Sequence, residues 1–353
     1  MAEQDTTRAN ITRANITQVL GLDGRRQRAA VVLNPTKFTG VHDLAVLHRE
    51  VSAALARCGW TLALWLPTTA ETLGRAETRC AVAAGVDVVL AAGGDGTVRA
   101  VAGELLGSGV ALGIVPVGTG NLLARNLGIP LDDVSAAVQV ACEGPRARLD
   151  VGRLEVDRDG DGRHVREHVF LVMAGAGFDA AMMAGAGTQL KRRWGHAAYV
   201  ISGVRALRRA PSVVSVQAVD ANGWTEGRTR SAHGVVVGNC GQLTMGLSLL
   251  PGADPTDGFL DAVVLLPDTL LQWARAAGSL VWGRGRPQPL LPRLRSRSIE
   301  VSSDVALPVQ VDGDVVGSAR RLRLSTAAAA LSVCRPDAAG ARAHDGIELS
   351  LAS

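Results

Sequence analysis

Apolar runs and helix-like patterns alternate through the first part of the chain, between Arg28 and about Asp150. Strands are predicted over 29–33, 61–66, 86–92 and 111–115, and helices over about 41–57, 71–84, 120–126 and 131–142, with another starting near 97. This alternation is typical of βαβ units, which build a mostly parallel sheet with helices on both faces. Ligands of such sheets bind beyond the carboxyl ends of the strands.

After Asp150 the chain changes to strand-like alternation of apolar and polar residues. The alternating segments are 153–173, 212–230, 233–239 and 259–266, and Asp-Gly or Asn-Gly steps at 159–162, 222–223 and 312–313 predict hairpin turns. We therefore expect an α/β nucleotide-binding domain over 28–150 and an antiparallel, β-rich, sandwich-like domain over 151–334, whose last elements return to pack on the first. The ends, 1–27 and 335–353, are predicted to be disordered tails.

The composition agrees with a folded protein of two domains. Of the 353 residues 47% are hydrophobic and 20% charged, and the net charge of +4 is too small to require a nucleic-acid partner. The five cysteines are scattered without CxxC or Cys/His spacing, which indicates a reducing compartment without disulfides or a zinc site. Neither a secretory signal nor an uncharged apolar run of about 18 residues occurs. We expect a cytoplasmic protein that contacts the inner face of the membrane peripherally.

A helical stretch over about 188–209 is rich in basic residues. Two interpretations stay open for it: a solvated charged face, or a patch that faces anionic lipid. Its basic residues are Lys191, Arg192, Arg193, Arg205, Arg208 and Arg209.

A glycine-rich turn, Gly93-Gly94-Asp95-Gly96-Thr97, follows the third predicted strand and opens a helix. Glycines at a helix start let backbone N–H groups approach phosphate oxygens, and the helix dipole favours negative charge there. The carboxylate of Asp95 would repel phosphate, so we expect it to act through Mg²⁺ and water or on the nucleotide. The plain alternative is a turn that only ends the strand.

Similar turns follow the other three strands of the first domain. Gly118 and Gly120 keep side chains out of a cleft, Thr119 offers a hydroxyl and an N–H at a helix start, and Lys37 is available for a phosphate. Each turn alone could be structural, but four turns at consecutive strand ends predict a nucleotide-binding site. The residues of these three turns are Asn34, Pro35, Thr36 and Lys37, then Thr68 or Thr69, then Gly118, Thr119, Gly120 and Asn121.

These motifs resemble the catalytic domain of the diacylglycerol kinase and sphingosine kinase family, which includes bacterial soluble lipid kinases. The resemblance is carried by Asn-Pro-Thr, Gly-Gly-Asp-Gly-Thr and Pro-x-Gly-Thr-Gly-Asn followed by Ala-Arg, with later marks at 175–179, 191–199, 254–261 and 311–314. It implies an ATP-dependent lipid kinase that moves the γ-phosphoryl group of MgATP to a hydroxyl of a membrane lipid, such as diacylglycerol or a sphingoid lipid.

The resemblance also implies roles for residues of the second domain. Asp314, in the turn Asp312-Gly313-Asp314, stands at the place of the general base, and Asp95 would hold that carboxylate or the metal in position. The loop 254–259 resembles a structural magnesium loop. In it Asp257 would be the side-chain ligand, and Asp254 and Phe259 would give backbone oxygens.

The expected partner is a lipid substrate at the membrane surface, and a homodimer is left open. An apolar groove for the acyl chain is expected near 175–205. Asp179, Lys191 and Arg192 are the candidates there for contact with lipid or membrane.

The chain departs from the family pattern at two places. An Asn-Glu pair that commonly follows Gly-Gly-Asp-Gly-Thr by one residue is replaced by Arg99 and Ala100, and Asp314 stands where glutamate is usual. Two alternatives therefore stay open. An NAD kinase shares Gly-Gly-Asp-Gly-Thr and also phosphorylates a hydroxyl with ATP, although this chain has no GPTAY-like segment. A catalytically weak regulator that binds nucleotide or lipid would fit the departures.

Overall fold

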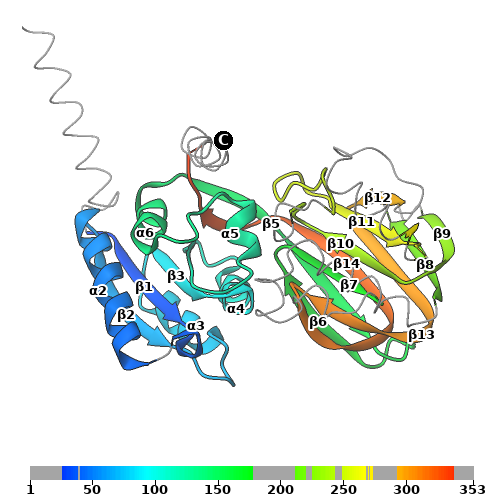
Figure 1. Ribbon diagram of the computed structural model, residues 1–353, viewed down its shortest axis with the longest axis horizontal. Coiled ribbons are helices and arrows are strands. Elements are labelled where there is room, and N and C mark those ends of the chain that lie inside the picture. Colours follow the sequence, from blue (N-terminus) through cyan, green and yellow to red (C-terminus); the bar gives the residue numbers. More distant parts are fainter. Residues whose placement is uncertain are drawn as a thin grey trace, which may run out of the picture. The chain divides into compact units, whose positions relative to one another are not determined.

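The chain folds into two compact units, Met1–Ala147 together with Leu331–Ser353, and Arg148–Ala330 (Figure 1). The computed structural model describes residues 26–38, 40–177, 211–219, 225–242, 249–267, 269, 271–272 and 292–337. Both predicted tails, apart from their innermost residues, and the basic stretch 188–209 lie outside the described residues. The first unit takes back the last residues of the long final strand, so that its sequence is not continuous.

The first unit contains a parallel sheet in the strand order β4-β3-β1-β2. Val333, near the end of the final strand, pairs in parallel with Leu112 on the free side of β4. Strands β3 and β4 are buried along their whole length, which explains their uninterrupted apolar runs. The four strands are β1 (Arg28–Leu33), β2 (Thr61–Pro67), β3 (Val88–Gly93) and β4 (Ala111–Pro116).

Helices cover both faces of this sheet, as the alternation predicted. Helices α2 and α6 pack together on one face, and α3 and α4 pack together on the other (Figure 1). The face of α2 that meets the sheet carries Leu47, Val51 and Leu55 at helical spacing. The helices are α2 (Val41–Arg57), α3 (Arg75–Ala83), α4 (Asp95–Leu105), α5 (Leu122–Asn126) and α6 (Val134–Glu143), with a 3₁₀ turn η1 (Pro35–Lys37).

Three helices of this unit, α3, α5 and α6, begin two to four residues later than the sequence predicted, and the difference is largest for α3. The pattern predicted a helix from residue 71, but α3 starts at Arg75. The hydroxyls and backbones of Thr69 and Thr72 bond to each other, and Gly74 has a φ of 104°, in the left-handed region. These threonine bonds give the backbone an alternative to the helix ladder until Gly74 has turned the chain.

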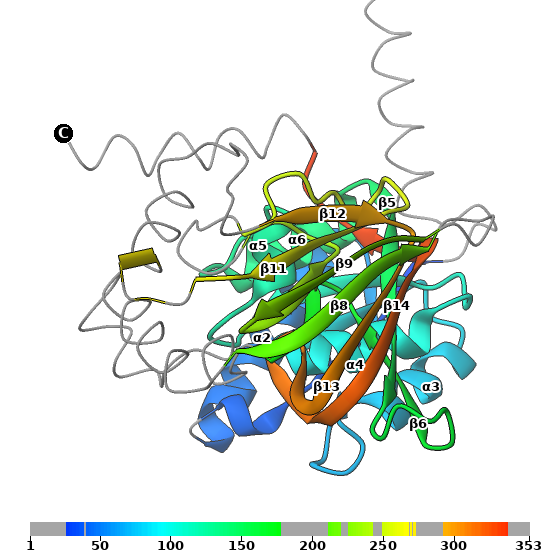
Figure 2. The same cartoon turned by 90° about the vertical axis from the view of Figure 1, so that its right-hand side faces the viewer.

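The second unit is built from antiparallel strands. Its main order is β12-β11-β10-β7-β13-β14 (Figure 1). Strand β8 lies beside β13, with β9 on the other side of β8 (Figure 2), and β5 lies beside β14, with β6 paired to β5. The strands are β5 (Arg146–Asp157), β6 (Val165–Phe170), β7 (Met173–Ala176), β8 (Ser212–Val219), β9 (Thr225–Ala232), β10 (Gly234–Gly238), β11 (Leu260–Leu265), β12 (Arg293–Ser296), β13 (Ser298–Val311) and β14 (Asp314–Cys334).

The three predicted hairpins are confirmed. Antiparallel pairing joins β5 to β6, β8 to β9 and β13 to β14 across the predicted turns. The last of these turns has two residues, Asp312 and Gly313, with φ of 46° and 92°. Positive φ at both positions is the geometry that a two-residue hairpin favours.

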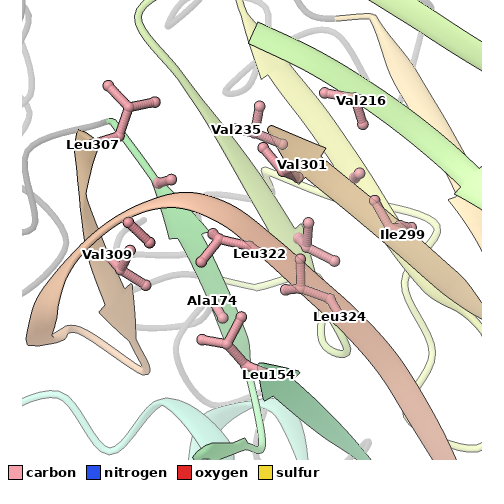
Figure 3. Close-up of a cluster of buried hydrophobic side chains, with 14 of the residues drawn as sticks. Leu154, Ala174, Val216, Val235, Ile299, Val301, Leu307, Val309, Leu322 and Leu324 are labelled. Atoms are coloured by element: carbon pink, nitrogen blue, oxygen red, sulfur yellow. The ribbon is translucent and has the colours of Figure 1, made fainter. Parts of the chain in front are cut away.

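The core of the second unit lies between its layers of strands. Alternate residues of β13, among them Ile299, Val301 and Val309, point into it and meet Leu322 and Leu324 of β14 (Figure 3). The intervening Glu300 lies outside and pairs with arginines of β14. In the described part of the chain, no helix combines the length and hydropathy needed to cross a bilayer.

Candidate nucleotide-binding site

The turns that follow β1, β3 and β4 come together at the carboxyl end of the first unit's sheet. A Cβ atom added to Gly118 would collide with the Cα of Gly94, and one added to Gly94 would lie 3.8 Å from Cε of Lys37. Two backbones therefore approach each other where neither carries a side chain, and the lysine stem lies beside them. Glycine is needed here for the close approach, since Gly118 has no room for a methyl group.

Helix α4 begins at the contact between Gly94 and Gly118. Its N-cap is Gly94, and its first turn consists of Asp95, Gly96 and Thr97. The first N–H groups of a helix have no partner within the helix and favour an anion. Gly93 lets the strand turn into this helix, because a Cβ at that position would lie 2.5 Å from Cβ of Thr97.

Asn34 links the turn after β1 to this helix. Its side-chain oxygen accepts bonds from the N–H of Thr36 at 3.0 Å and from its hydroxyl at 2.7 Å. Its amide nitrogen lies 3.5 Å from the hydroxyl oxygen of Thr97. Pro35 begins the 3₁₀ turn, which ends at the exposed Lys37. Asn34 therefore shapes the loop that presents the lysine.

Asp95 holds the turn after β4. Its Oδ1 accepts the backbone N–H of Leu122, the first residue of α5, at 2.6 Å. A Cβ on Gly120 would lie 2.6 Å from Asp95 Oδ2. A carboxylate that accepts a backbone N–H makes a strong, charge-assisted hydrogen bond. The structure thus gives Asp95 a positioning role between two turns, which the expectation of a metal-linked role did not include.

Asn121 and Arg125 close the same turn from within. Asn121 has a φ of 50°, and its side chain accepts the N–H of Gly118 at 3.1 Å and donates to its carbonyl at 2.8 Å. Arg125 Nε donates to the carbonyl of Gly120 at 3.0 Å, while Thr119 at the tip is exposed. The motif pointed to Arg125 only as a family mark, and its contact with the turn comes from the structure.

The threonines after β2 contribute less than the sequence predicted. Thr68 is buried, and a Cβ on Gly74 would lie 3.4 Å from its methyl group. Thr69 is exposed and bonds to Thr72. Within the described residues, neither threonine has a hydrogen bond to the other three turns. The close grouping therefore rests on the turns after β1, β3 and β4.

The predicted base lies in the second unit, at the start of β14. Asp312 is buried, and its carboxylate accepts the N–H groups of Leu171, Val172 and Met173 at 2.9 to 3.1 Å. Asp314, two residues later, is exposed. The two acids of the Asp-Gly-Asp turn therefore differ in role: Asp312 anchors the turn, and Asp314 is carried on that anchored turn.

The loop 254–259, predicted to bind magnesium, is closed by an arginine. Asp257 Oδ1 accepts the N–H of Phe259, and Oδ2 lies 2.6 Å from Nη2 of Arg295. The Arg295 guanidinium carbon lies 4.7 Å from the centre of the Phe259 ring, and that of Arg297 lies 5.3 Å from it. Positive charge therefore already meets one oxygen of this carboxylate, at the residue predicted to be the side-chain ligand of magnesium.

The other acids around this loop agree with that arrangement. Asp254 Oδ1 accepts the N–H and the hydroxyl of Thr256, and burial raises the pKa of Asp261 although Arg295 lies nearby. Among the described residues, no group of three or more His, Cys, Asp or Glu side chains is placed to hold a metal ion. The magnesium ligands in this loop stay a prediction, which metal removal can test.

Asp150 is a structural residue that the sequence did not reveal. Its carboxylate accepts the N–H of Gly258 at 2.6 Å and that of Ala329 at 2.7 Å, and its own N–H donates to the carbonyl of Pro255. Ala329 has a φ of 49°, which is strained for alanine. Asp150 therefore ties the 254–259 loop to an unusual kink in β14. No spacing motif marks it, because its partners are 108 and 179 residues away.

The candidates for lipid contact cannot be placed in this way. Asp179, Lys191 and Arg192 lie outside the described residues, as does most of the region 175–205.

Comparison with known proteins decides the family. Residues 28–154 match the model of the diacylglycerol kinase catalytic domain, and residues 172–335 match that of the YegS C-terminal NAD kinase beta sandwich-like domain. A probable lipid kinase YegS-like protein of Pseudomonas aeruginosa is 34% identical over 305 residues, covering 83% of this chain and 94% of the relative. The chain belongs to the diacylglycerol kinase catalytic-domain family. Its members include lipid kinases, and the resemblance read from the motifs is confirmed.

A second relative supports the same family, and a solved structure matches the fold. A diacylglycerol kinase of Mycobacterium tuberculosis is 30% identical over 258 residues, covering 72% of this chain and 79% of that protein. The crystal structure of a putative diacylglycerol kinase from Bacillus anthracis aligns with a TM-score of 0.66 and 19% identity, over 88% of this chain and 98% of that one. The structural match confirms the predicted fold, an α/β domain with a parallel sheet and an antiparallel β-rich domain.

Proposed function

We propose that this chain transfers the γ-phosphoryl group of MgATP to a hydroxyl group of a membrane lipid. Family membership supports a kinase that acts on lipid. The finer statements, which concern the donor, the acceptor and the residues that serve them, are argued from the geometry below.

The observation that carries the donor assignment is the contact between Gly94 and Gly118. Two side-chain-free turns, the start of α4 and the stem of Lys37 together offer backbone N–H groups and one cation to an anion. This combination is the usual way in which a protein binds the phosphates of a nucleotide. Transfer of a phosphoryl group depends mainly on such positioning and charge neutralisation. When bound, MgATP would supply the phosphoryl group and the metal charge.

The acceptor hydroxyl needs a group that takes its proton. Asp314 is an exposed carboxylate on a turn that is fixed by the three bonds of Asp312 and by the bond from the N–H of Gly313 to Gln310 Oε1 at 2.9 Å. A fixed turn holds the backbone that carries the carboxylate in place, which helps to position a proton acceptor. The family supports a lipid acceptor, since one relative is named a probable lipid kinase and another a diacylglycerol kinase.

Replacement of Asp314 tests this assignment. Asp314→Asn should lower kcat by about 10²- to 10⁴-fold, the usual value of a positioned proton acceptor, with little change in the Kd for ATP. Asp314→Glu restores the family's usual residue and should keep substantial activity. Turnover of Asp314→Asn at nearly the wild-type rate would place the base elsewhere.

The acceptor can be assigned by a panel. Purified protein is incubated with labelled ATP and with diacylglycerol, a sphingoid base or other hydroxyl-bearing lipids in micelles, and NAD serves as a separate arm. Label in a lipid product supports the proposal, and label in NADP would favour an NAD kinase. ATP binding without transfer to any acceptor would favour the regulator.

A further inference from the structure

A groove of about 700 Å³ lies in the second unit between the β5–β6 hairpin and the start of β14. The hairpin contributes Arg158, Arg163 and Arg166 to it, and β14 contributes Val316 to Ser318. None of these residues has a part in the phosphate-binding turns. The groove begins two residues after Asp314, about 7 Å along the strand.

The register of the hairpin explains how the groove comes to be basic. Val156 pairs with Arg166, and Leu154 pairs with His168, so these four side chains share one face of the hairpin. Leu154 is completely buried and Val156 is nearly so, whereas Arg166 is exposed. One face of the hairpin therefore packs into the core at Leu154 and Val156 and carries the exposed Arg166. The groove has apolar residues at its base for this reason.

The charges of the groove are unbalanced. Three arginines line it and one carboxylate, that of Asp159, opposes them. Arg163 has only an exposed, 3.7 Å contact with Asp161. Within the described part of the chain, Arg158 and Arg166 have no ion-pair partner. Arginine guanidinium groups pair with phosphate oxygens through two parallel hydrogen bonds, so this groove suits a phosphate group.

The backbone that carries these arginines is fixed in place. The buried carboxylate of Asp157 accepts the N–H groups of Gly160 and Gly162 at 2.9 Å each. The N–H of Arg320 on β14 donates to the carbonyl of Arg158 at 3.1 Å. The backbone around these arginines is therefore already ordered before a ligand binds. Binding then loses less conformational entropy, which favours affinity.

We propose that this groove binds the phosphate headgroup of an anionic phospholipid at a bilayer surface. The arginines would hold the phosphate, and Val156, Val165 and Val316 would contact the less polar part next to it. The inference rests on the proposed lipid kinase function only in its choice of a lipid over other phosphate compounds. A bound headgroup would bring the bilayer to the strand that carries Asp314.

The test is vesicle binding without nucleotide, which separates it from any failure of kinase activity. Vesicles of phosphatidylcholine and phosphatidylglycerol in equal parts are sedimented with the full chain at low salt. Each basic residue near an anionic surface contributes an attraction that corresponds to about fivefold in partition. Arg166→Ala should weaken binding about fivefold, and Arg158→Ala/Arg166→Ala about 25-fold.

The matched control is Arg153→Ala. Arg153 is exposed on the same hairpin but pairs with Val169, on the face opposite to Arg166. Arg153→Ala should weaken vesicle binding by less than about twofold. All variants should keep the wild-type Tm. Equal effects of Arg153→Ala and Arg166→Ala would overturn the proposal, because general surface charge would then explain binding. Glycerol phosphate that competes with vesicles at equal phosphate concentration would also overturn it, in favour of a site for a soluble phosphate.

Discussion

Gly118→Ala is the change that tests the phosphate-binding arrangement most directly. The added methyl group would collide with the Cα of Gly94 and would lie 2.8 Å from Oδ1 of Asn121 and 3.1 Å from the backbone N of Gly94. Two of these neighbours are backbone atoms, which cannot rotate away. The turns after β3 and β4 must therefore separate, by about 1 Å, before the methyl group fits.

The size of the effect follows from that displacement. Overpacking of this kind costs about 1 to 3 kcal/mol of stability. A misplacement of about 1 Å in a site that works by positioning can cost about 10²-fold in rate. We expect Gly118→Ala to lower kcat/KM for ATP by about 10- to 100-fold and to raise the Kd for ATP.

Two further glycines calibrate this result. A Cβ on Gly94 would lie 3.5 Å from the Cα of Gly118, an ordinary van der Waals distance, so Gly94→Ala should be milder than Gly118→Ala. Gly40 is exposed with nothing within 4 Å of an added Cβ, and its φ of 173° is extended, so Gly40→Ala should keep the wild-type ATP affinity and turnover. Isothermal titration with ATP, steady-state kinetics and thermal unfolding measure the three variants. Wild-type ATP affinity and turnover in Gly118→Ala would refute the close-contact reasoning.

The remaining predictions concern carboxylates. Asp95→Asn weakens the bond to the N–H of Leu122 and should lower kcat/KM by at least about tenfold while circular dichroism stays unchanged, and wild-type kinetics would contradict its positioning role. Because Arg295 meets Asp257 at 2.6 Å, EDTA should leave the Tm unchanged and Arg295→Ala should lower it, whereas a fall in Tm on chelation would reveal a resident metal. Burial raises the pKa of Asp261, and its Oδ2 has no hydrogen-bond partner in the described chain, so the ionised group destabilises the fold. Asp261→Asn should therefore raise the Tm at neutral pH, with a gain that disappears as the pH falls to about 4, near the unfolded pKa; a gain independent of pH would contradict this.

Local patterns predicted most of the first unit because its strands are short, buried and followed by helices. The helix predicted over about 41–57 is α2, Val41–Arg57, because its apolar residues recur at helical spacing. The start of α3 was wrong because the mutual bonds of Thr69 and Thr72 are a side-chain effect that hydrophobic spacing does not register. The hairpins of the second unit were predicted because Asp-Gly and Asn-Gly steps fix positive φ locally.

The sequence by itself determined the two kinds of sheet, the positions of the turns that we propose to bind phosphate, and the family, since each of these depends on residues close together in the chain. Only the tertiary structure decided which group each carboxylate bonds to. Asp95 meets Leu122, Asp312 meets Leu171 at a separation of 141 residues, and Asp257 meets Arg295. These partners come together only when the chain folds, and a carboxylate that is partly or fully removed from water is stabilised by the N–H or guanidinium group that the fold places beside it.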